Sequence, residues 1–177
     1  MRGPVCYAPC FNELLVRMVN KRSLILKITA KLAGELEVYS RAAQFARAEA
    51  THEQNKAEHK YDTRGLEASY LARGQSRQAA EIEAAIAEFN KLDPRPFAPG
   101  EPIGLGALVE LTHGSETALY FLGPRAGGTE VLHDHKEVMV ITPQSPLGEQ
   151  LMGRKQGDHP ELKFGGSRQP AHIVSVI

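Results

Sequence analysis

The most constraining feature of this chain is a long stretch that lacks helix breakers. No proline occurs between Pro9 and Pro94, and after Cys10 this stretch holds only three glycines, Gly34, Gly65 and Gly74. Proline and glycine are the residues that most often interrupt or end a helix. About eighty residues almost free of both therefore predict long helices.

Apolar residues recur along this stretch at the spacing of packed helices. One stripe repeats every seven residues and contains Ile25, Leu32, Tyr39 and Ala46, accompanied by Leu36, Ala43 and Ala50. A second stripe advances in alternating steps of four and three and contains Leu71, Gln75, Gln78, Ile82, Ala85, Phe89 and Leu92. Such stripes are typical of two helices that pack along their length. We predict an antiparallel coiled-coil hairpin over 19–92 with its turn between 52 and 65. A first arm reaching Lys60 would be longer than the second. We therefore expect the first arm to end earlier, or to extend past the base of the hairpin, which is the end opposite the turn.

The chain changes character after this hairpin. Residues 93–102 read DPRPFAPGEP, a proline-rich linker that cannot continue a helix. Beyond it the hydrophobic period becomes two, which is typical of strands. We expect strands near 106–111, 118–122, 137–142, 161–164 and 171–177, a short helix after Ser145, and a hairpin turn at Gly127-Gly128. The fold class is therefore α+β, with a two-helix coiled coil followed by a small α+β domain over 103–177.

The charge balance and the first residues narrow the function classes. The chain has 21 basic and 21 acidic side chains, so no net charge attracts it to nucleic acid or to an anionic membrane. No apolar run approaches the roughly 18 residues of a membrane span, and we expect a cytoplasmic protein. Residues 1–18 are interpreted as a disordered extension, unless translation begins at Met18. This segment holds both cysteines, Cys6 and Cys10, and two thiols alone do not complete a zinc site.

The segment 145–158, SPLGEQLMGRKQGD, carries the most specific pattern. Ser145 can cap a helix whose first turn contains Pro146, since proline lacks an N–H that would be unpaired there anyway. The apolar residues Leu147, Leu151 and Met152 then fall on one face, and Gly153 stands where the helix should stop. Gly157-Asp158 predicts a tight turn before the last strands.

This pattern resembles the C-terminal domain of the Gre family of bacterial transcript-cleavage factors. Ser-Pro-Leu-Gly, Leu-x-Gly and Gly-Asp recur there at fixed offsets, and GLGALV at 104–109 and YFLG at 120–123 also match. The hairpin, linker and small domain occur in the family's order. The resemblance implies a C-terminal fold similar to FK506-binding proteins. It also makes Ser145, Pro146, Leu147 and Gly148 candidates for contact with a partner, or residues that serve only the structure of this domain.

The resemblance further implies the partner and the chemistry. In the family, the C-terminal domain docks at the rim of the RNA polymerase secondary channel, and the coiled coil carries acidic tip residues to the polymerase active site. There they help to hold a second Mg²⁺ while the polymerase hydrolyses its own backtracked RNA. Mg²⁺ prefers oxygen ligands and usually takes only one or two carboxylates. The factor would have no cofactor of its own and would meet RNA only within the polymerase complex.

The residues of this tip differ from the family pattern. The family places an aspartate and a glutamate three residues apart, with asparagine after the glutamate and Ala-x-Tyr soon after. Here Ala68-x-Tyr70 matches, and Asp62 and Glu67 are the nearest acids, but they lie five apart and Arg64 stands between them. Arginine could neutralise the acids or bind a phosphate. Asp62 and Glu67 are therefore candidate Mg²⁺-binding carboxylates, and the other interpretation is that they are ordinary solvated charges.

Three functions remain open. The first is an elongation factor that stimulates RNA cleavage without being an enzyme itself. The second is a regulator that occupies the same channel without catalysis and competes with cleavage factors. The third is a peptidyl-prolyl isomerase or chaperone-like domain with a helical dimerisation arm, and its isomerase activity would rest on fold analogy and on the aromatic residues Tyr120, Phe121 and Phe164. His133-Asp134-His135 is a weak metal candidate, because no further ligand lies near it in the sequence.

Overall fold

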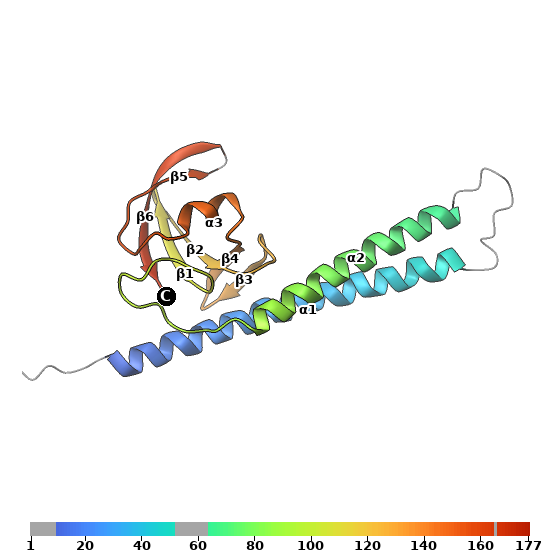
Figure 1. Ribbon diagram of the computed structural model, residues 1–177, viewed down its shortest axis with the longest axis horizontal. Coiled ribbons are helices and arrows are strands. Elements are labelled where there is room, and N and C mark those ends of the chain that lie inside the picture. The colour runs from blue at the N-terminus through green and yellow to red at the C-terminus, as the bar shows by residue number, and fades with distance from the viewer. Residues whose placement is uncertain (1–9, 52–63, 165) are drawn as a thin grey trace, which may run out of the picture. The chain divides into compact units, whose positions relative to one another are not determined.

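The computed structural model describes residues 10–51, 64–164 and 166–177. The described residues form two compact units, one containing the residues up to Ile28 together with Lys91–Ile177, the other Thr29–Asn90. Figure 1 shows the elements, which in chain order are α1 (Cys10–Thr51), α2 (Arg64–Asn90), β1 (Leu108–His113), β2 (Glu116–Leu122), β3 (Glu130–His133), β4 (Lys136–Ile141), α3 (Pro146–Leu151), β5 (Glu161–Phe164) and β6 (Ser167–Val176). We call the two units the sheet unit and the helical unit.

The helical unit is the predicted antiparallel hairpin. Within it, α1 and α2 run side by side in opposite directions (Figure 1). The first stripe is confirmed as an inward face, because all seven of its residues are buried or half-buried. The second stripe is confirmed at Ile82, Ala85 and Phe89, which are buried, and at Gln75 and Leu92, which are half-buried. In the earlier part of α2, before Ile82, the half-buried positions are Gly65, Ala68, Ala72, Gln75 and Ala79.

The prediction of an inward position is wrong for two residues of the second stripe. Leu71 is 56% exposed, and Gln78 is also exposed. Small alanine side chains allow two helices to approach closely. The inward positions in this part of α2 are therefore mostly alanines, whereas the prediction chose the larger Leu71.

Helix α1 extends farther than expected at its start. It begins at Cys10, so residues 10–18, expected to belong to a disordered extension, are helical. It ends at Thr51, before Lys60, and α2 begins at Arg64. The predicted turn thus falls mainly outside the described residues. The 93–102 linker lies within the sheet unit and contains no regular element.

The sheet unit is built on one mixed sheet of six strands in the order β3-β4-β2-β1-β6-β5. Only β2 and β4 pair in parallel, and the other neighbours are antiparallel. One core packs the α3 side of the sheet and includes Val109, Leu111, Leu122, Ile141, Leu151, Leu162 and Ile173. The predicted α+β class is confirmed, whereas the similarity to FK506-binding proteins stays a prediction.

Strand β3 is absent from the strands that the sequence predicts, and the predicted hairpin turn at Gly127-Gly128 is wrong. Gly127 and Gly128 lie between β2 and β3, two strands that do not pair with each other. The hairpin instead joins β3 to β4 through Asp134 and His135, whose φ angles are 49° and 62°. A two-residue turn with both φ values positive matches the twist of antiparallel strands. Within the described residues, no helix combines the length and the apolar composition needed to cross a bilayer.

Candidate functional site

The Ser-Pro-Leu-Gly motif forms the start of α3, as predicted. Ser145 is the N-cap, with φ −71° and ψ 152°, and Pro146 occupies the first turn. The Ser145 hydroxyl accepts a hydrogen bond from the Gly148 N–H at 3.1 Å and donates one to the Thr142 carbonyl at 2.8 Å. One serine therefore satisfies an otherwise unpaired N–H at the helix start and fixes the preceding turn.

Gly148 is required by close packing against the backbone. A Cβ atom at this position would lie 1.9 Å from the Thr142 carbonyl oxygen and 2.8 Å from its carbonyl carbon. Neither atom is the end of a flexible side chain, so any larger residue would have to displace α3 from the end of β4. The glycine of the motif thus serves the structure of the sheet unit.

The residues after α3, 153–158, attach this helix to the segment that follows the linker and to β6. Gly153, at φ 78°, donates its N–H to the Ile103 carbonyl at 2.9 Å, and the Ile103 N–H bonds the Arg154 carbonyl at 2.7 Å. Asp158 closes the following turn by accepting the Lys155 N–H at 2.9 Å. The predicted stop and turn are both present, and the turn is joined to β6 by the Gly157 N–H, which donates to the Ile173 carbonyl at 2.8 Å, and by the Ile173 N–H, which donates to the Asp158 carbonyl at 3.0 Å.

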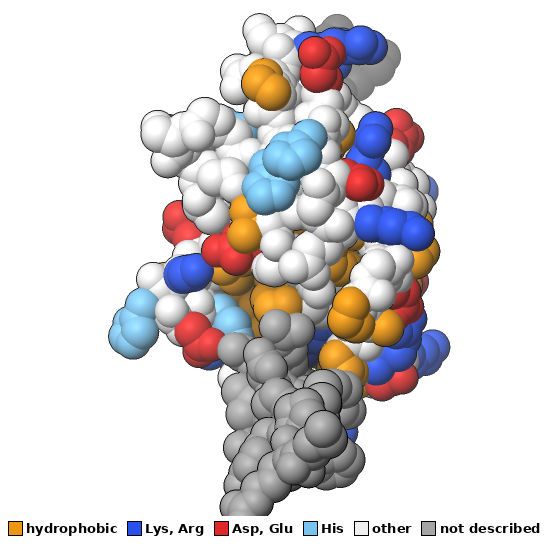
Figure 2. Space-filling model, turned by 90° about the vertical axis from the view of Figure 1, so that its left-hand side faces the viewer, with side chains coloured by type: hydrophobic (Ala, Val, Ile, Leu, Met, Phe, Trp, Pro, Cys, Tyr) orange, Lys and Arg blue, Asp and Glu red, His pale blue; other side chains and the backbone are white. Residues whose placement is uncertain are grey.

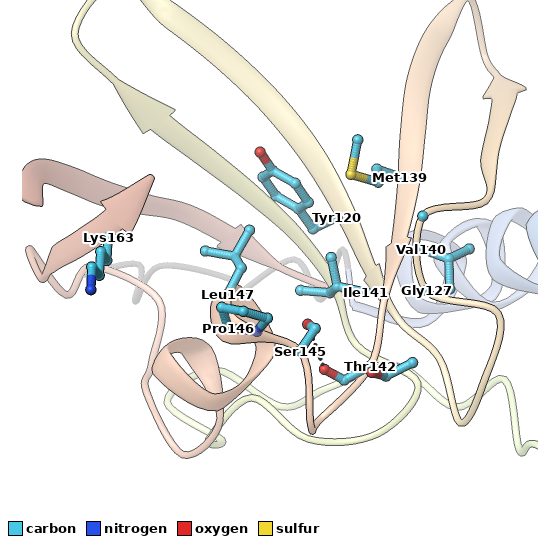
Figure 3. Close-up of a pocket in the computed structure, with 11 residues that line it drawn as sticks. Tyr120, Gly127, Met139, Val140, Ile141, Thr142, Ser145, Pro146, Leu147 and Lys163 are labelled. Atoms are coloured by element: carbon cyan, nitrogen blue, oxygen red, sulfur yellow. Dashed lines mark hydrogen bonds between the residues drawn. The ribbon is translucent and has the colours of Figure 1, made fainter. Parts of the chain in front are cut away.

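An apolar cavity of about 610 Å³ opens beside α3. Tyr120 and Met139 border it from the paired strands β2 and β4, and Ile141 and Leu147 contribute aliphatic surface. Figure 3 shows these side chains around the cavity, with Lys163 standing apart on β5. Leu147 is half-buried and Pro146 is exposed, so the first residues of the motif line an open surface. Burial raises the pKa of the Tyr120 hydroxyl, and the Glu116 carboxylate adds to this effect.

The aromatic residues expected for an isomerase pocket are not gathered here. Tyr120 lines the cavity, whereas Phe121 is fully buried and points to the other side of β2. The position of the Phe164 side chain lies outside the described part of the chain. Tyr120 is thus the only aromatic side chain among the described residues that line this cavity.

The distal end of the helical unit carries one of the two candidate carboxylates. Glu67 is exposed in the first turn of α2, and Asp62 lies outside the described residues. Glu67 is followed by Ala68 on the seam and by Tyr70, which is 66% exposed. The two residues of the Ala-x-Tyr pair therefore differ in environment, because Ala68 is half-buried while Tyr70 faces solvent.

A buried lysine that sequence reasoning missed holds the linker against α1. Lys21 is 1% exposed, and its Nζ donates to the Arg95 carbonyl at 2.7 Å. Its Nζ also lies 4.5 Å from the Phe97 ring centroid, a cation–π distance. Burial and, to a smaller extent, the Arg95 charge lower the pKa of Lys21 to about 8. No sequence signal distinguishes this lysine from the exposed Lys27 and Lys31, which lie about two and three turns later on the same helix.

Arg95 is itself fixed by an acid. Its guanidinium forms two hydrogen bonds with Glu101, at 3.1 and 2.5 Å, and lies 4.8 Å from the Phe97 ring. The hydrogen bonds from Arg95, with that from the Ala98 N–H, lower the pKa of Glu101 to about 2. Lys21, Arg95, Phe97 and Glu101 form a cluster that we call the linker clamp.

The histidine candidates do not assemble a metal centre. His133 is buried and His135 is exposed in the β3–β4 turn. Burial lowers the pKa of His133, against the opposing effect of Asp134. Among the described residues, no three histidine, cysteine or carboxylate side chains come together as a metal site.

Figure 2 shows one face of the molecule, on which basic and acidic side chains are interspersed.

Comparison with known proteins gives matches only among solved structures. No protein-family model matches the chain, and no curated protein matches it. The chain is similar to GreA factor homolog 1 (Gfh1) of Thermus thermophilus, with 25% identity over 84% of this chain and 94% of that chain and a TM-score of 0.35.

Two further structures extend this finding. Thermus aquaticus Gfh1 is 27% identical over 83% of this chain and 92% of that chain, with a TM-score of 0.37. The prokaryotic transcription elongation factor GreA/GreB from Nitrosomonas europaea is 24% identical over 54% of this chain and 78% of that chain, with a TM-score of 0.35. The chain thus resembles Gre factors and their homologues, and its fold is defined by the elements described above.

Proposed function

We propose that this protein is a transcription elongation factor that binds RNA polymerase at the secondary channel and stimulates cleavage of backtracked RNA. The sheet unit docks at the channel rim and the helical unit enters the channel. The protein acts as an accessory factor, because hydrolysis takes place in the polymerase active site with the Mg²⁺ of that site.

The observation that carries this proposal is the state of the Ser-Pro-Leu-Gly motif. Ser145 and Gly148 are committed to capping and close packing, while Pro146 is exposed and Leu147 lines an open apolar cavity. An apolar cavity with a few polar groups at its edge is the usual form of a binding site. The motif whose sequence resembles the Gre docking domain therefore has both a structural half and a half available to a partner.

The helical unit supplies the means to reach a distant site. A helical pair with a narrow, alanine-containing seam is thin, and Glu67 lies exposed in the first turn of the returning helix. A carboxylate at such a place could share a Mg²⁺ ion whose other ligands are water and phosphate. In two-metal hydrolysis this ion would help to activate the attacking water or stabilise the leaving oxygen. Asp62 is proposed as the second carboxylate.

A backtracked elongation complex provides the test. Wild-type protein should accelerate RNA cleavage, and Asp62→Ala and Glu67→Ala should lose this acceleration while still binding the polymerase. Glu83→Ala is the matched control, since Glu83 is an exposed glutamate on the same helix several turns from its start. Equal loss in all three variants, or no loss in the two tip variants, would contradict the proposed role of the tip.

A second function is favoured by one feature of the tip sequence. Asp62 and Glu67 lie five residues apart with Arg64 between them, where the family pattern has acids three apart. A channel-binding regulator without catalytic effect would tolerate this change. In that case wild-type protein binds the polymerase, fails to accelerate cleavage, and reduces the activity of an added cleavage factor in proportion to its occupancy.

A further inference from the structure

The sheet unit carries a pair of stacked histidines that belong to different segments. The ring centroids of His159 and His172 lie 4.2 Å apart, and the two ring planes are inclined by only 6°. His159 precedes β5 and is exposed, whereas His172 belongs to β6 and is half-buried. Because the two residues come from separate segments, no ligand spacing in the sequence indicates this pair.

A β-bulge begins the backbone pairing that brings the two rings together. The hydrogen bonds that Ile173 forms with Gly157 and Asp158 set two residues against one, with Gly157 at φ 88° in the first place. This is the pattern of a bulge that starts with glycine, a residue that adopts positive φ without strain. The bulge fixes which residue of the segment before β5 faces which residue of β6.

The register that follows from the bulge places the histidines directly opposite each other. The Ala171 N–H bonds the Pro160 carbonyl at 2.9 Å, so backbone hydrogen bonds flank the position of His159 and His172 on both sides. These two residues thus form a non-hydrogen-bonded pair, the kind in which opposing side chains come closest. The stacking of the two rings is therefore set by the backbone.

This pair lies on the face of the sheet that points away from α3. Ala171 and Ile173 belong to the core on the α3 side, and successive side chains of a strand point to opposite faces. On the same face as His172, Thr112 of β1 stands opposite it in the register. His159 stands beyond β6, at the edge where the sheet ends with β5, and this edge is open to solvent.

The ring nitrogens of this pair are available to a ligand. Within the described ranges of the chain, no hydrogen bond or ion pair engages either ring. Neutral imidazole is a good ligand for zinc, copper and nickel ions. Tetrahedral zinc, with Zn–N bonds of about 2.0–2.1 Å, holds two nitrogens about 3.4 Å apart. Rings with centroids 4.2 Å apart reach this separation by a small tilt of the exposed His159 ring.

We propose that His159 and His172 form a two-histidine site for a divalent transition metal ion of the zinc, nickel and copper class, with water in the remaining coordination positions. The ion joins the segment before β5 to β6 and stabilises this edge of the sheet, because it binds the folded state. The Asp158 carboxylate is engaged by the Lys155 N–H at 2.9 Å, so the site offers nitrogen ligands. Mg²⁺ prefers oxygen ligands and does not bind here. This inference is independent of the proposed function.

Metal titration of the full-length protein, first freed of metal by a chelator, tests the inference. The probes are Zn²⁺ and Ni²⁺, with Mg²⁺ as the control ion. In NMR spectra, Zn²⁺ should shift and Ni²⁺ should broaden the imidazole signals of His159 and His172 at concentrations at least about tenfold below those that affect His135, because two ligands chelate the ion. Equal responses of the three histidines, or an equal response to Mg²⁺, would overturn the inference. These signals report on each histidine separately, so zinc held by Cys6 and Cys10 would not be mistaken for this site.

A matched pair of substitutions separates a metal site from a simple aromatic stack. His159→Asn removes one ligand at an exposed position and should weaken the effect of Ni²⁺ on His172 by about a hundredfold, because the chelate is lost. His135→Asn makes the same change at an exposed histidine of the β3–β4 turn, where asparagine tolerates the φ of 62°, and should leave the effect unchanged. Zn²⁺ should also raise the midpoint of thermal unfolding less in His159→Asn than in His135→Asn. Equal metal responses of the two variants would overturn the inference and leave only a stacked pair.

Discussion

The sheet unit and the helical unit place glycine under opposite constraints. In the sheet unit, a Cβ atom at Gly148 would lie 1.9 Å from a backbone oxygen. In the helical unit, a Cβ atom at Gly34 or Gly74 would meet no atom within 4 Å. The first glycine is required by tertiary packing, whereas the other two weaken a helix without serving a contact. The comparison teaches that the sheet unit is specified by a few close contacts and the helical unit by a repeated pattern that tolerates change.

The largest effect should come from Gly148→Ala. The added methyl group collides with the Thr142 carbonyl, so α3 must shift, and we expect a loss of about 3 kcal/mol or more in the free energy of unfolding of the sheet unit. Urea unfolding followed by tyrosine near-ultraviolet circular dichroism measures this loss. Gly153→Ala is the control, with open space but a φ of 78°, and should cost about 1 kcal/mol. Equal losses of stability for Gly148→Ala and Gly153→Ala would contradict the conclusion that close packing requires glycine at position 148.

The next prediction separates the two leucines of α3. Leu151 is fully buried in the core, so Leu151→Ala should destabilise the sheet unit by about 2–5 kcal/mol. Leu147 is half-buried at the cavity, so Leu147→Ala should cost about 1 kcal/mol and leave a folded protein in which polymerase binding can be measured. The same unfolding experiment gives both values. A loss of stability for Leu147→Ala as large as that for Leu151→Ala would show that the cavity side of α3 belongs to the core.

The linker clamp should make stability depend on pH above neutrality. The pKa of Lys21 is about 8 in the folded protein and 10.5 as its ordinary value, so the unfolded chain binds more protons between these pH values. The contribution of Lys21 to stability therefore rises as the pH increases from about 8 to about 10.5. Urea unfolding at several pH values should show that the free energy of unfolding of wild type increases relative to that of Lys21→Met across this window. A constant difference would mean that Lys21 titrates with its usual pKa.

The smallest effects should have the opposite sign and occur in the helical unit. Gly34→Ala and Gly74→Ala should each stabilise it by about 0.5–1 kcal/mol, because alanine favours helix and no neighbour obstructs its Cβ. Thermal unfolding followed by circular dichroism at 222 nm measures the change. Destabilisation by either substitution would reveal a close contact at that helix position and weaken the contrast with Gly148.

The features that follow from local rules could be predicted from the sequence. The absence of proline located both long helices, the repeat of seven identified the α1 seam, and Ser145-Pro146 located the start of α3 to the residue. Each of these depends on spacing or on the conformation of one or two residues. The same rules could show that Gly148 belongs to a specific motif but not that its absent side chain makes room for Thr142.

The features that depend on tertiary contact could not be predicted. Strand β3 has only four residues and is completed by its pairing with β4, so its own sequence carries a weak signal. Leu71 was assigned to the seam for its size, although the helices approach on alanine. Lys21 is buried because Arg95 and Phe97, more than seventy residues away, cover it. The candidate site was predicted as a motif, whereas its cavity required the positions of α3, β4 and β5.

The linker clamp has a practical consequence for dissecting this protein. A fragment that starts at residue 93 would retain every strand, yet it would lose the ammonium group that bonds the Arg95 carbonyl and contacts the Phe97 ring. Phe97 belongs to the same apolar core as Leu151 and Leu162. A fragment that begins at the proline-rich linker would thus uncover Phe97 and weaken the core of the sheet unit. A fragment meant to preserve the sheet unit must also include the part of α1 that contains Lys21.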